Sequence, residues 1–256
     1  MGILSFLFPD LPSREEMLGM QGEFSSAVRL GWVNFLGYDG KILRNVYVPS
    51  KNGKTTEIDL LYITQKGIFV LESKNYSGYI FGDEQNAQWT TTLYAGRDWT
   101  GKSKVEKHHL YNPIWQNQTH IKFLKRYLNR DVQMMSLIVF SERCQLKQIN
   151  YQSPDVVVCQ VNDLPRCIRK MWSMYPDIFS EAQIEVIYKS LLPLTHPGAE
   201  VKKQHVQDIK DKLNDPTVCP RCGGKLILRT AKNGAYAGKQ FYGCSNYPRC
   251  RYIRNL

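Results

Sequence analysis

The alternation of apolar and polar positions predicts a mixed α/β core in residues 1–192. Apolar residues at helical spacing predict a helix over 14–36, and short runs of branched and aromatic residues predict strands. The helical positions are Met17, Met20, Phe24, Ala27, Val28 and Leu30. The expected strands cover 42–48, 57–64, 68–74, 79–81, 89–94, 134–140 and 155–161. Later helices are expected over 112–128, 163–174 and 180–191.

The strands 57–64 and 68–74 are apolar on both faces, which is typical of a central sheet covered by helices. The pattern of helices and strands therefore predicts an α/β (α+β) domain with a central sheet covered by helices. Residues 193–216 are polar and contain three prolines, so we interpret them as a linker. Within it, Glu200–Leu213 could form a charged helix.

The turn between the two central strands determines which residues face one another. If Gln65 and Lys66 form a two-residue loop, Thr64 pairs with Gly67, and Asp59 then lies opposite Glu72. A three-residue loop with a glycine bulge would instead place Asp59 and Glu72 on opposite faces. Hydrophobicity leaves both registers open, because both faces are apolar.

With the two-residue loop, one end of one sheet face gathers four charged residues: Glu57, Asp59, Glu72 and Lys74. Opposed carboxylates repel each other unless a cation lies between them, and a hard divalent ion such as Mg²⁺ suits their oxygens. Such an ion stabilises charge on a phosphate, while Lys74 could orient the attacking water. The alternative interpretation is a pair of surface carboxylates with a Glu57–Lys74 salt bridge.

Three further polar residues lie near the predicted core. Glu23 shares a helix stripe with apolar residues, so its carboxylate either needs a buried partner or reaches solvent at the helix boundary. Gln116 and His120 are four residues apart on a later helix and flank its apolar stripe. Taken alone, this pair is more typical of packed polar residues than of catalytic ones.

Composition narrows the class of protein. The 256 residues are 43% hydrophobic and carry a formal charge of +11, so a mainly disordered chain is excluded. No apolar run approaches the roughly 20 residues that span a bilayer. The apolar segment Met1–Phe8 lacks a basic n-region and a cleavage site, so we do not interpret it as a signal peptide. Together with the odd number of seven cysteines, this favours a reducing, cytoplasmic location.

The last 40 residues form a distinct unit, 217–256, that contains eight Lys and Arg residues and no Asp or Glu. Aromatic residues alternate with these cations, a combination that suits a nucleic-acid strand. Cys219 and Cys222 form a Cys-x₂-Cys pair, and Cys244 and Cys250 follow 21 residues later. Four thiolates at this spacing predict one tetrahedral Zn²⁺, which would supply the folding energy of so small a unit.

Four groups of residues resemble the nuclease-related domain, NERD, of the PD-(D/E)xK nuclease superfamily. They are Gly22-Glu23, Glu57-Ile-Asp59, Glu72-Ser-Lys74-Asn75-Tyr76-Ser77-Gly78 and Asn112-Pro113-Ile-Trp-Gln116-Asn117. The resemblance covers residues 15–130 and implies a restriction-endonuclease-like mixed central sheet flanked by helices, in the order helix, three strands, helix, strand. The residues of this chain give that order, with an insertion at 79–111. It implies that Asp59 and Glu72 hold Mg²⁺ (or Mn²⁺) and that Lys74 is the catalytic lysine. Glu23 matches the first-helix acid and Gln116 the glutamine of the later helix, while Ile58 stands where the superfamily name has proline.

The C-terminal unit is similar to the zinc fingers of bacterial type IA topoisomerases, which bind single-stranded DNA. The similarity lies in Cys-Pro-Arg-Cys-Gly-Gly-Lys-Leu and in Phe241-Tyr-Gly-Cys-Ser-Asn-Tyr-Pro-Arg-Cys-Arg-Tyr. The topoisomerase catalytic domain is missing, so the similarity implies a binding role alone. The expected nucleic-acid contacts are Arg221, Lys239, Phe241, Tyr242, Tyr247, Arg249, Arg251 and Tyr252.

These observations favour a Mg²⁺-dependent nuclease that acts on DNA, with a zinc ribbon that binds single-stranded or structured DNA. The second hypothesis is a non-catalytic nucleic-acid-binding or DNA-processing accessory protein with a degenerate nuclease scaffold. The third is a module that binds a signalling partner. The sequence leaves open whether RNA is also bound and how many chains assemble.

Overall fold

The computed structural model describes residues 14–51, 53–97, 99–219, 221–222, 224–234 and 236–255. Met1–Phe8 and the side chains of Met17, Met20 and Phe24 lie outside the described part. The helices are α2 (Arg14–Phe35), α3 (Pro113–Leu128), α4 (Leu164–Met174), α5 (Glu181–Leu191) and α6 (Ala199–Asn214), with 3₁₀ turns η1 (Val161–Asp163) and η2 (Leu192–Thr195). None of the described helices is long and apolar enough to cross a membrane.

The strands form three sheets. The central sheet has the order β1-β2-β3-β7-β9, with β1 (Gly40–Pro49), β2 (Thr55–Thr64), β3 (Gly67–Lys74), β7 (Met134–Phe140) and β9 (Val156–Gln160). The second sheet has the order β6-β5-β4-β8, with β4 (Gly78–Asp83), β5 (Gln88–Arg97), β6 (Ser103–Tyr111) and β8 (Cys144–Asn150). The third contains β10 (Leu226–Thr230), β11 (Gln240–Cys244) and β12 (Ile253–Asn255).

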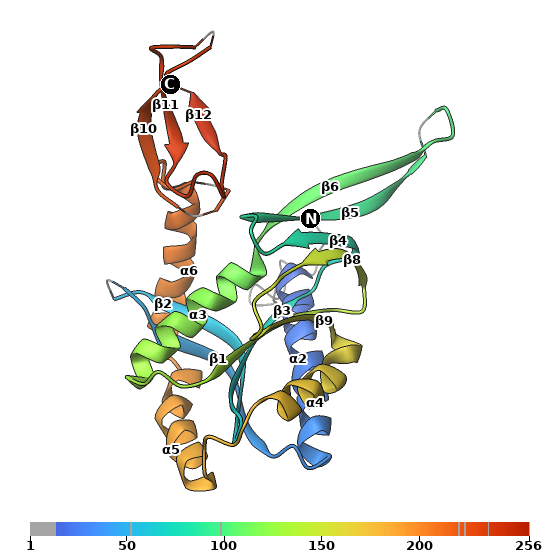
Figure 1. The fold of residues 1–256 in the computed structure, drawn as a ribbon, viewed down its shortest axis with the longest axis vertical. Coiled ribbons are helices and arrows are strands. Elements are labelled where there is room, and N and C mark those ends of the chain that lie inside the picture. Colours follow the sequence, from blue (N-terminus) through green and yellow to red (C-terminus); the bar gives the residue numbers. More distant parts are fainter. Residues whose placement is uncertain are drawn as a thin grey trace, which may run out of the picture.

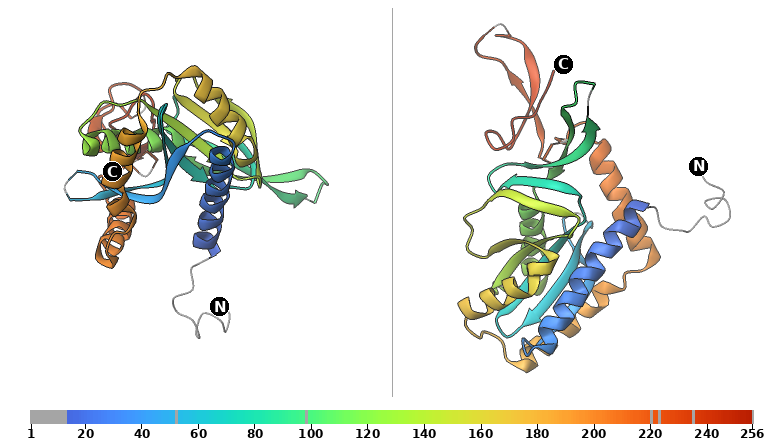
Figure 2. Two further views of the ribbon diagram at one scale, coloured as in Figure 1. Left: turned by 90° about the horizontal axis from the view of Figure 1, so that it is seen from below. Right: turned by 90° about the vertical axis from the view of Figure 1, so that its right-hand side faces the viewer.

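The central sheet is mixed and is covered by helices on both faces, as the sequence predicts (Figure 1). Its first three strands are antiparallel, and β3, β7 and β9 are parallel. On one face, Leu60 and Phe69 pack with α2 and α4 through Leu30 and Ile168. On the other face, an equally apolar set of residues packs with α3 and α5 (Figure 2). Strands buried on both sides explain why hydrophobicity alone did not fix their register.

The two-residue turn at Gln65 and Lys66 is confirmed. Thr64 pairs with Gly67, and the ladder continues to Leu60 opposite Leu71. Gly67 has φ +125°, and a Cβ atom there would lie 2.6 Å from the Gln133 carbonyl oxygen. Glycine is therefore required by backbone conformation and by the close approach of the neighbouring chain, without any bulge.

The second sheet extends the predicted insertion at 79–111. Two of its strands, β6 and β8, have no counterpart among the expected elements, because their mostly polar side chains are largely exposed. Trp89 and Ile80 pack with Phe140 of the central sheet, so the two sheets share a buried cluster. The outer ends of β5 and β6 project from the body as a long hairpin (Figures 1 and 2).

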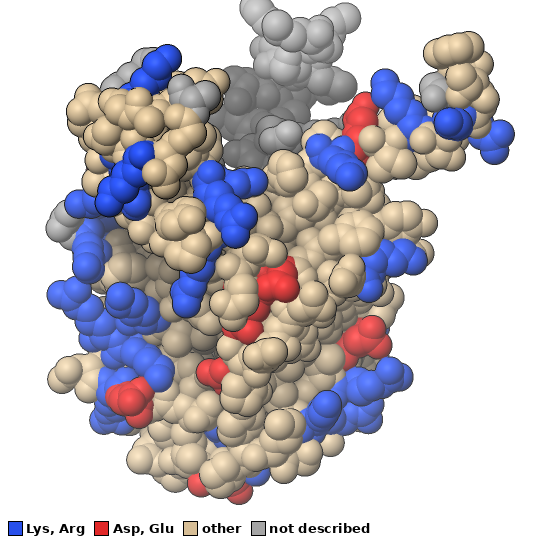
Figure 3. All heavy atoms as spheres, turned by 45° about the horizontal axis from the view of Figure 1, so that its top comes forward, with Lys and Arg blue, Asp and Glu red and all other residues tan. Residues whose placement is uncertain are grey.

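Helix α6 occupies much of the expected linker and leads into the ribbon. Lys54 forms an ion pair with Asp208 at 3.3 Å, so α6 contacts the strand turn of the core. The ribbon contacts the core in turn, because Arg221 Nε donates to Gln88 Oε1 at 2.9 Å and Ala87 packs with the cysteine cluster. Lys and Arg side chains are prominent on the ribbon and along the projecting hairpin in Figure 3.

Candidate active site and zinc centre

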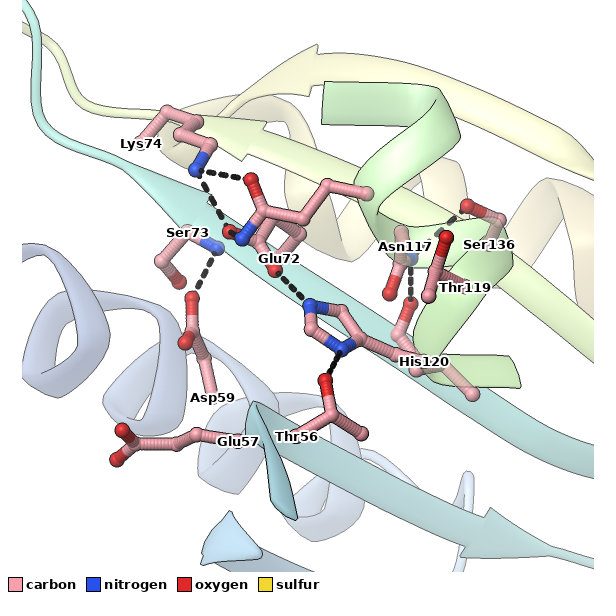
Figure 4. Close-up of polar contacts among 12 residues, drawn as sticks. Thr56, Glu57, Asp59, Glu72, Ser73, Lys74, Asn117, Thr119, His120 and Ser136 are labelled. Carbon is pink, nitrogen blue, oxygen red and sulfur yellow. Dashed lines mark hydrogen bonds and ion pairs between the residues drawn. The ribbon is translucent and has the colours of Figure 1, made fainter. Parts of the chain in front are cut away.

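Glu72, Lys74 and Gln116 form a closed set of contacts at the C-terminal end of β3. Lys74 Nζ lies 2.7 Å from Glu72 Oε1 and donates to Gln116 Oε1 at 3.0 Å. Gln116 Nε2, from the first turns of α3, donates to the same Glu72 oxygen at 2.7 Å (Figure 4). Three residues that the sequence assigns to the site are thus brought together by one strand and one helix.

His120 joins this set, although the sequence gave no reason to favour a catalytic role for it. Its Nε2 lies 3.2 Å from Glu72 Oε2, and its Nδ1 lies 2.7 Å from the Thr56 hydroxyl. One turn of helix separates Gln116 from His120, so both reach the same carboxylate. The four-residue spacing was the available signal, but it gained meaning only once β3 placed Glu72 beneath α3.

Glu72 and Lys74 each stabilise the charged form of the other. Burial would raise the pKa of Glu72, but Lys74 and His120 outweigh burial and hold that pKa below its usual value. Burial would lower the pKa of Lys74, but the carboxylates of Glu72 and Asp59 raise it. Glu72 is therefore a carboxylate and Lys74 an ammonium, even though both are enclosed by protein.

Asp59 lies in β2, one residue beyond the last ladder pair with β3. The Ser73 amide donates to Asp59 Oδ2 at 2.7 Å, which ties this carboxylate to the strand that carries Glu72 and Lys74 (Figure 4). Burial, followed by the Glu72 charge, raises the pKa of Asp59 well above its ordinary value, and Lys74 opposes this shift. The surrounding protein groups therefore do not fully offset a negative charge on Asp59.

Glu23 approaches the same region from α2. Asn45 Nδ2 donates to Glu23 Oε2 at 3.3 Å and lies 3.4 Å from Glu57 Oε1, so one amide bridges both acids. Asn45 reaches them from a positive φ of 51° in β1. Burial, together with the charges of Glu57 and Glu72, raises the pKa of Glu23 against the effect of Asn45. The sequence missed Asn45, whose side chain matters only because β1 passes beside α2.

The expected position of Glu57 opposite Lys74 was wrong. The β2–β3 ladder ends at Leu60 and Leu71, so Glu57 and Lys74 are not paired across it, while on the other edge of β2 Glu57 pairs with Tyr47 of β1. Lys74 turns toward Glu72 and Gln116, while Glu57 lies 3.8 Å from His205 Nε2. Beyond Leu71, β3 continues in its pairing with β7 as far as Lys74.

A cleft of about 680 Å³ opens beside these residues, lined by Asp59, Gln116 and His120. Its opposite wall comes from α6 and the start of the ribbon, including His205 and Val218. His205 Nδ1 lies 2.9 Å from Thr55 Oγ1, and its ring packs edge-on against Tyr47. The expected linker therefore contributes side chains to the cleft, a role that its polar sequence did not reveal.

The residues around Asp59 and Glu72 fit a hard divalent cation. Both carboxylates are withdrawn from water: Glu72 is buried with its Oε2 3.2 Å from His120 Nε2, and burial together with the Glu72 charge raises the pKa of Asp59. Both offer carboxylate oxygens, the ligands that Mg²⁺ takes in ones and twos beside water and phosphate. Among the described residues, these acids do not converge as tightly as the cysteine ligands below do.

Four cysteines of the ribbon form a metal centre. Their Sγ atoms all lie within 4.8 Å of one another, with Cys219 to Cys250 at 3.8 Å and Cys222 to Cys244 at 3.2 Å. Thiolates about 2.3 Å from a tetrahedral Zn²⁺ lie about 3.8 Å apart, so the cluster has the size of a zinc site. Asn246 supports it with two N–H groups, each 3.4 Å from the Sγ of Cys244 or Cys222.

The ribbon residues predicted to contact nucleic acid fall into two groups. Five are exposed: Arg221, Lys239, Tyr247, Arg249 and Arg251. The rings of Phe241, Tyr242 and Tyr252 are half-buried, and the last two pack against the cysteine cluster. Tyr236 is 67% exposed beneath Lys239 and belongs with the exposed group, although the sequence did not single it out.

A cavity of about 280 Å³ in the ribbon is lined by the rings of Phe241, Tyr247 and Tyr252. Arg229 and Arg251 also line it, so rings and cations meet at one place. Such a place suits an unpaired base with its phosphate.

Two family models match the chain. The nuclease-related domain matches residues 18–141, and the topoisomerase DNA binding C4 zinc finger matches residues 217–256. An uncharacterized protein of Bacillus anthracis is 31% identical over 173 residues, which cover 67% of this chain and 75% of that protein. The chain therefore belongs to the nuclease-related domain family, and it ends in a topoisomerase-type zinc ribbon.

The ribbon has its own relatives. DNA topoisomerase 1 of Methanocaldococcus jannaschii is 60% identical over 61 residues, 24% of this chain and 7% of that enzyme. The uncharacterized protein YrdD of Escherichia coli is 47% identical over 38 residues, 15% of this chain and 18% of that protein. These matches span less than a fifth of each relative. No solved structure is significantly similar to the chain.

Proposed function

We propose that this protein is a divalent-metal-dependent nuclease that hydrolyses DNA phosphodiester bonds. The observation that carries the proposal is the set of contacts among Glu72, Lys74 and Gln116 beside the desolvated carboxylate of Asp59. A purely structural scaffold has little use for two carboxylates and a lysine enclosed at one end of its sheet, because their desolvation opposes folding.

In this proposal Asp59 and Glu72 hold Mg²⁺ or Mn²⁺, which supplies Lewis-acid stabilisation of phosphate charge and a more acidic water. Lys74 and Gln116 both contact Glu72 Oε1, while Oε2 lies 3.2 Å from His120 Nε2 and keeps a lone pair for the ion. Lys74 is an ammonium, so it acts as a donor to a phosphoryl oxygen and orients the attacking water. Gln116 and His120 fix the orientation of Glu72, and Glu23 adds negative charge on the α2 side.

The ribbon holds the DNA strand beside the cleft. Arg221, Arg249 and Arg251 meet phosphates, while Phe241, Tyr247 and Tyr252 stack on unpaired bases. Tyr242 and Lys239 contribute at the edge of this surface. Single-stranded or structured DNA is therefore the proposed substrate, and α6 keeps the ribbon at one wall of the cleft.

The test is a titration of Mg²⁺ and Mn²⁺ with single-stranded, duplex and branched DNA and with RNA, comparing wild type with Asp59→Ala. We expect metal-dependent cleavage of DNA by wild type and none by the variant. Asp131→Asn, which alters an exposed acid after α3 that does not line the cleft, is the matched control and should cleave. Equal cleavage by Asp59→Ala would refute the site. DNA binding without cleavage under any metal would favour a non-catalytic accessory protein.

A further inference from the structure

The hairpin of β5 and β6 carries a feature that the nuclease site and the ribbon do not use. We call its outer part, residues 94–97 and 99–107, the arm. All described residues from 103 to 109 are exposed, and Trp99 in the turn is 97% exposed. The described part of the arm carries four cations and one acid, Glu106: the cations are Arg97, Lys102, Lys104 and Lys107. The arm projects from the body of the molecule (Figure 1), and Lys and Arg side chains lie along it (Figure 3). Its turn also exposes one large ring, that of Trp99.

The cations lie on both faces of the two-stranded arm. Thr92 pairs with Lys107 and Tyr94 with Val105, so Lys107 shares a face with Tyr94. Lys104 is an odd number of residues from Lys107 and points to the other face. If the arm lay flat on a single nucleic-acid strand, positive charge on one of its faces would suffice. Positive charge on both faces suits an arm that lies in a groove between two phosphate backbones.

Trp99 lies at the tip of the arm, where an arm bound in a groove would meet the bases. A single exposed apolar side chain is ordinary on a protein surface. Its position at the tip of the arm, with cations on both faces, is what favours a role in nucleic-acid binding. In the major groove, an apolar or aromatic side chain can contact base edges such as the thymine methyl group.

The inner end of the same hairpin lies against the basic surface of the zinc ribbon. Arg221 contacts Gln88, the first residue of β5, at 2.9 Å. A cavity of about 430 Å³ between Asn86–Gln88 and the ribbon is lined by Arg221, Arg249 and Arg251. One nucleic-acid molecule could therefore contact the ribbon and the arm at once.

We propose that the arm enters a groove of duplex DNA, with Lys104 and Lys107 on opposite phosphate walls and Trp99 at the base pairs. The inference rests on the proposed function in one respect, that DNA is the substrate. The major groove of B-DNA admits a two-stranded β-ribbon, whereas the major groove of duplex RNA is too narrow for side chains to read. The expected partner is therefore duplex DNA adjoining the single strand held by the ribbon.

The experiment measures affinity for a short DNA duplex against salt concentration, in an Asp59→Ala background that does not cleave. Each phosphate contact contributes about 0.9 to the slope of log K against log salt, so Lys104→Ala with Lys107→Ala should lower the slope by about 1.8. Lys189→Ala, which removes an exposed cation on α5, is the control and should leave the slope unchanged. Trp99→Ala should weaken duplex binding about tenfold at unchanged slope, and Trp99→Phe should restore most of that loss.

An unchanged slope in the double lysine variant would overturn the proposal. So would an equal loss of affinity for duplex RNA of the same sequence, because the arm would then act as a non-specific cation. Cleavage is assayed separately on proteins with Asp59 intact. Metal-dependent cleavage with an unchanged slope would refute the proposed duplex binding by the arm and leave the proposed nuclease activity intact. A reduced slope without any cleavage would refute the proposed nuclease activity and leave duplex binding by the arm intact.

Discussion

Lys74 Nζ lies 2.7 Å from Glu72 Oε1, although the two residues are only two positions apart on one strand. The lysine side chain reaches back along its own strand instead of crossing to β2, and Gln116 of α3 contacts both groups. The charge pair is thus closed by a helix from elsewhere in the chain. Its stability and its chemistry both depend on how α3 is placed.

Removing the lysine should destabilise the protein more than removing both charges. Lys74→Met leaves Glu72 buried without its main counter-charge, and breaking a buried pair costs about 3–5 kcal/mol. Glu72→Gln combined with Lys74→Met should cost clearly less than the sum of the single changes. Urea unfolding of the three variants measures this. Lys189→Ala breaks an exposed pair with Glu185 and should change the free energy of unfolding by less than about 1 kcal/mol. If the double variant lost as much free energy of unfolding as the two single variants together, the interaction between Glu72 and Lys74 would be contradicted.

Asp59→Asn should abolish cleavage and stabilise the folded protein when no Mg²⁺ is added. Its folded-state pKa is raised by burial and by Glu72, so at neutral pH the charged carboxylate opposes folding. Asparagine removes that charge and can still accept from the Ser73 amide. Loss of the metal's contribution of several kcal/mol corresponds to about a 10³-fold lower rate. Calorimetry without added Mg²⁺ and a cleavage assay test the two parts. A lower Tm in the variant would show that the charge is compensated.

The ribbon should bind one zinc ion per chain and lose it when a ligand is replaced. Cys219→Ser should release zinc and speed amide exchange in β10 and β11, because the ion supplies most of the folding energy of this small sheet. Strands β2 and β3 should keep their protection, since their core lies elsewhere. Native mass spectrometry and hydrogen exchange provide the readouts. Cys167→Ser, a partly buried cysteine of α4, is the control and should retain zinc. Full zinc content in Cys219→Ser would exclude that thiol as a ligand.

Asn112 should be the most sensitive polar residue of α3. Its Oδ1 caps the helix by accepting from Ile114 and Trp115, and its Nδ2 donates to the carbonyls of Asp83, Glu84 and Asn86. Asn112→Ala removes the cap and the donor to the Asn86 carbonyl, while the Asp83 and Glu84 carbonyls keep Trp89 Nε1 and Trp115 Nε1 as donors, so we expect a loss of about 2–4 kcal/mol. Asn112→Ser keeps a capping oxygen and should recover about 1 kcal/mol of that loss. Chemical denaturation compares the two, and an alanine variant as stable as wild type would contradict this role.

The central fold could be predicted because its elements carry strong local signals. The helix cap at Asn112-Pro113 and the all-apolar strand Met134–Phe140 each stand out within a short window, and both occur as expected. The strands β6 and β8 were missed for the opposite reason, since exposed polar strands lack an apolar pattern. The helical part of the expected linker was visible as a charged segment, but its contact with the cleft was not.

The sequence by itself determined which residues were candidates: the acids and lysine of two adjacent strands, and four cysteines at zinc-binding spacing. These are properties of residue type and short-range spacing, and both families follow from them. The tertiary structure alone decided that Lys74 pairs with Glu72 and not with Glu57, that His120 and Thr56 complete the environment of Glu72, and that His205 lines the cleft. The physical reason is that these contacts join segments up to about 150 residues apart. Their partners are set by where β2 leaves β3 and by where α3 and α6 pack, and no local pattern encodes those positions.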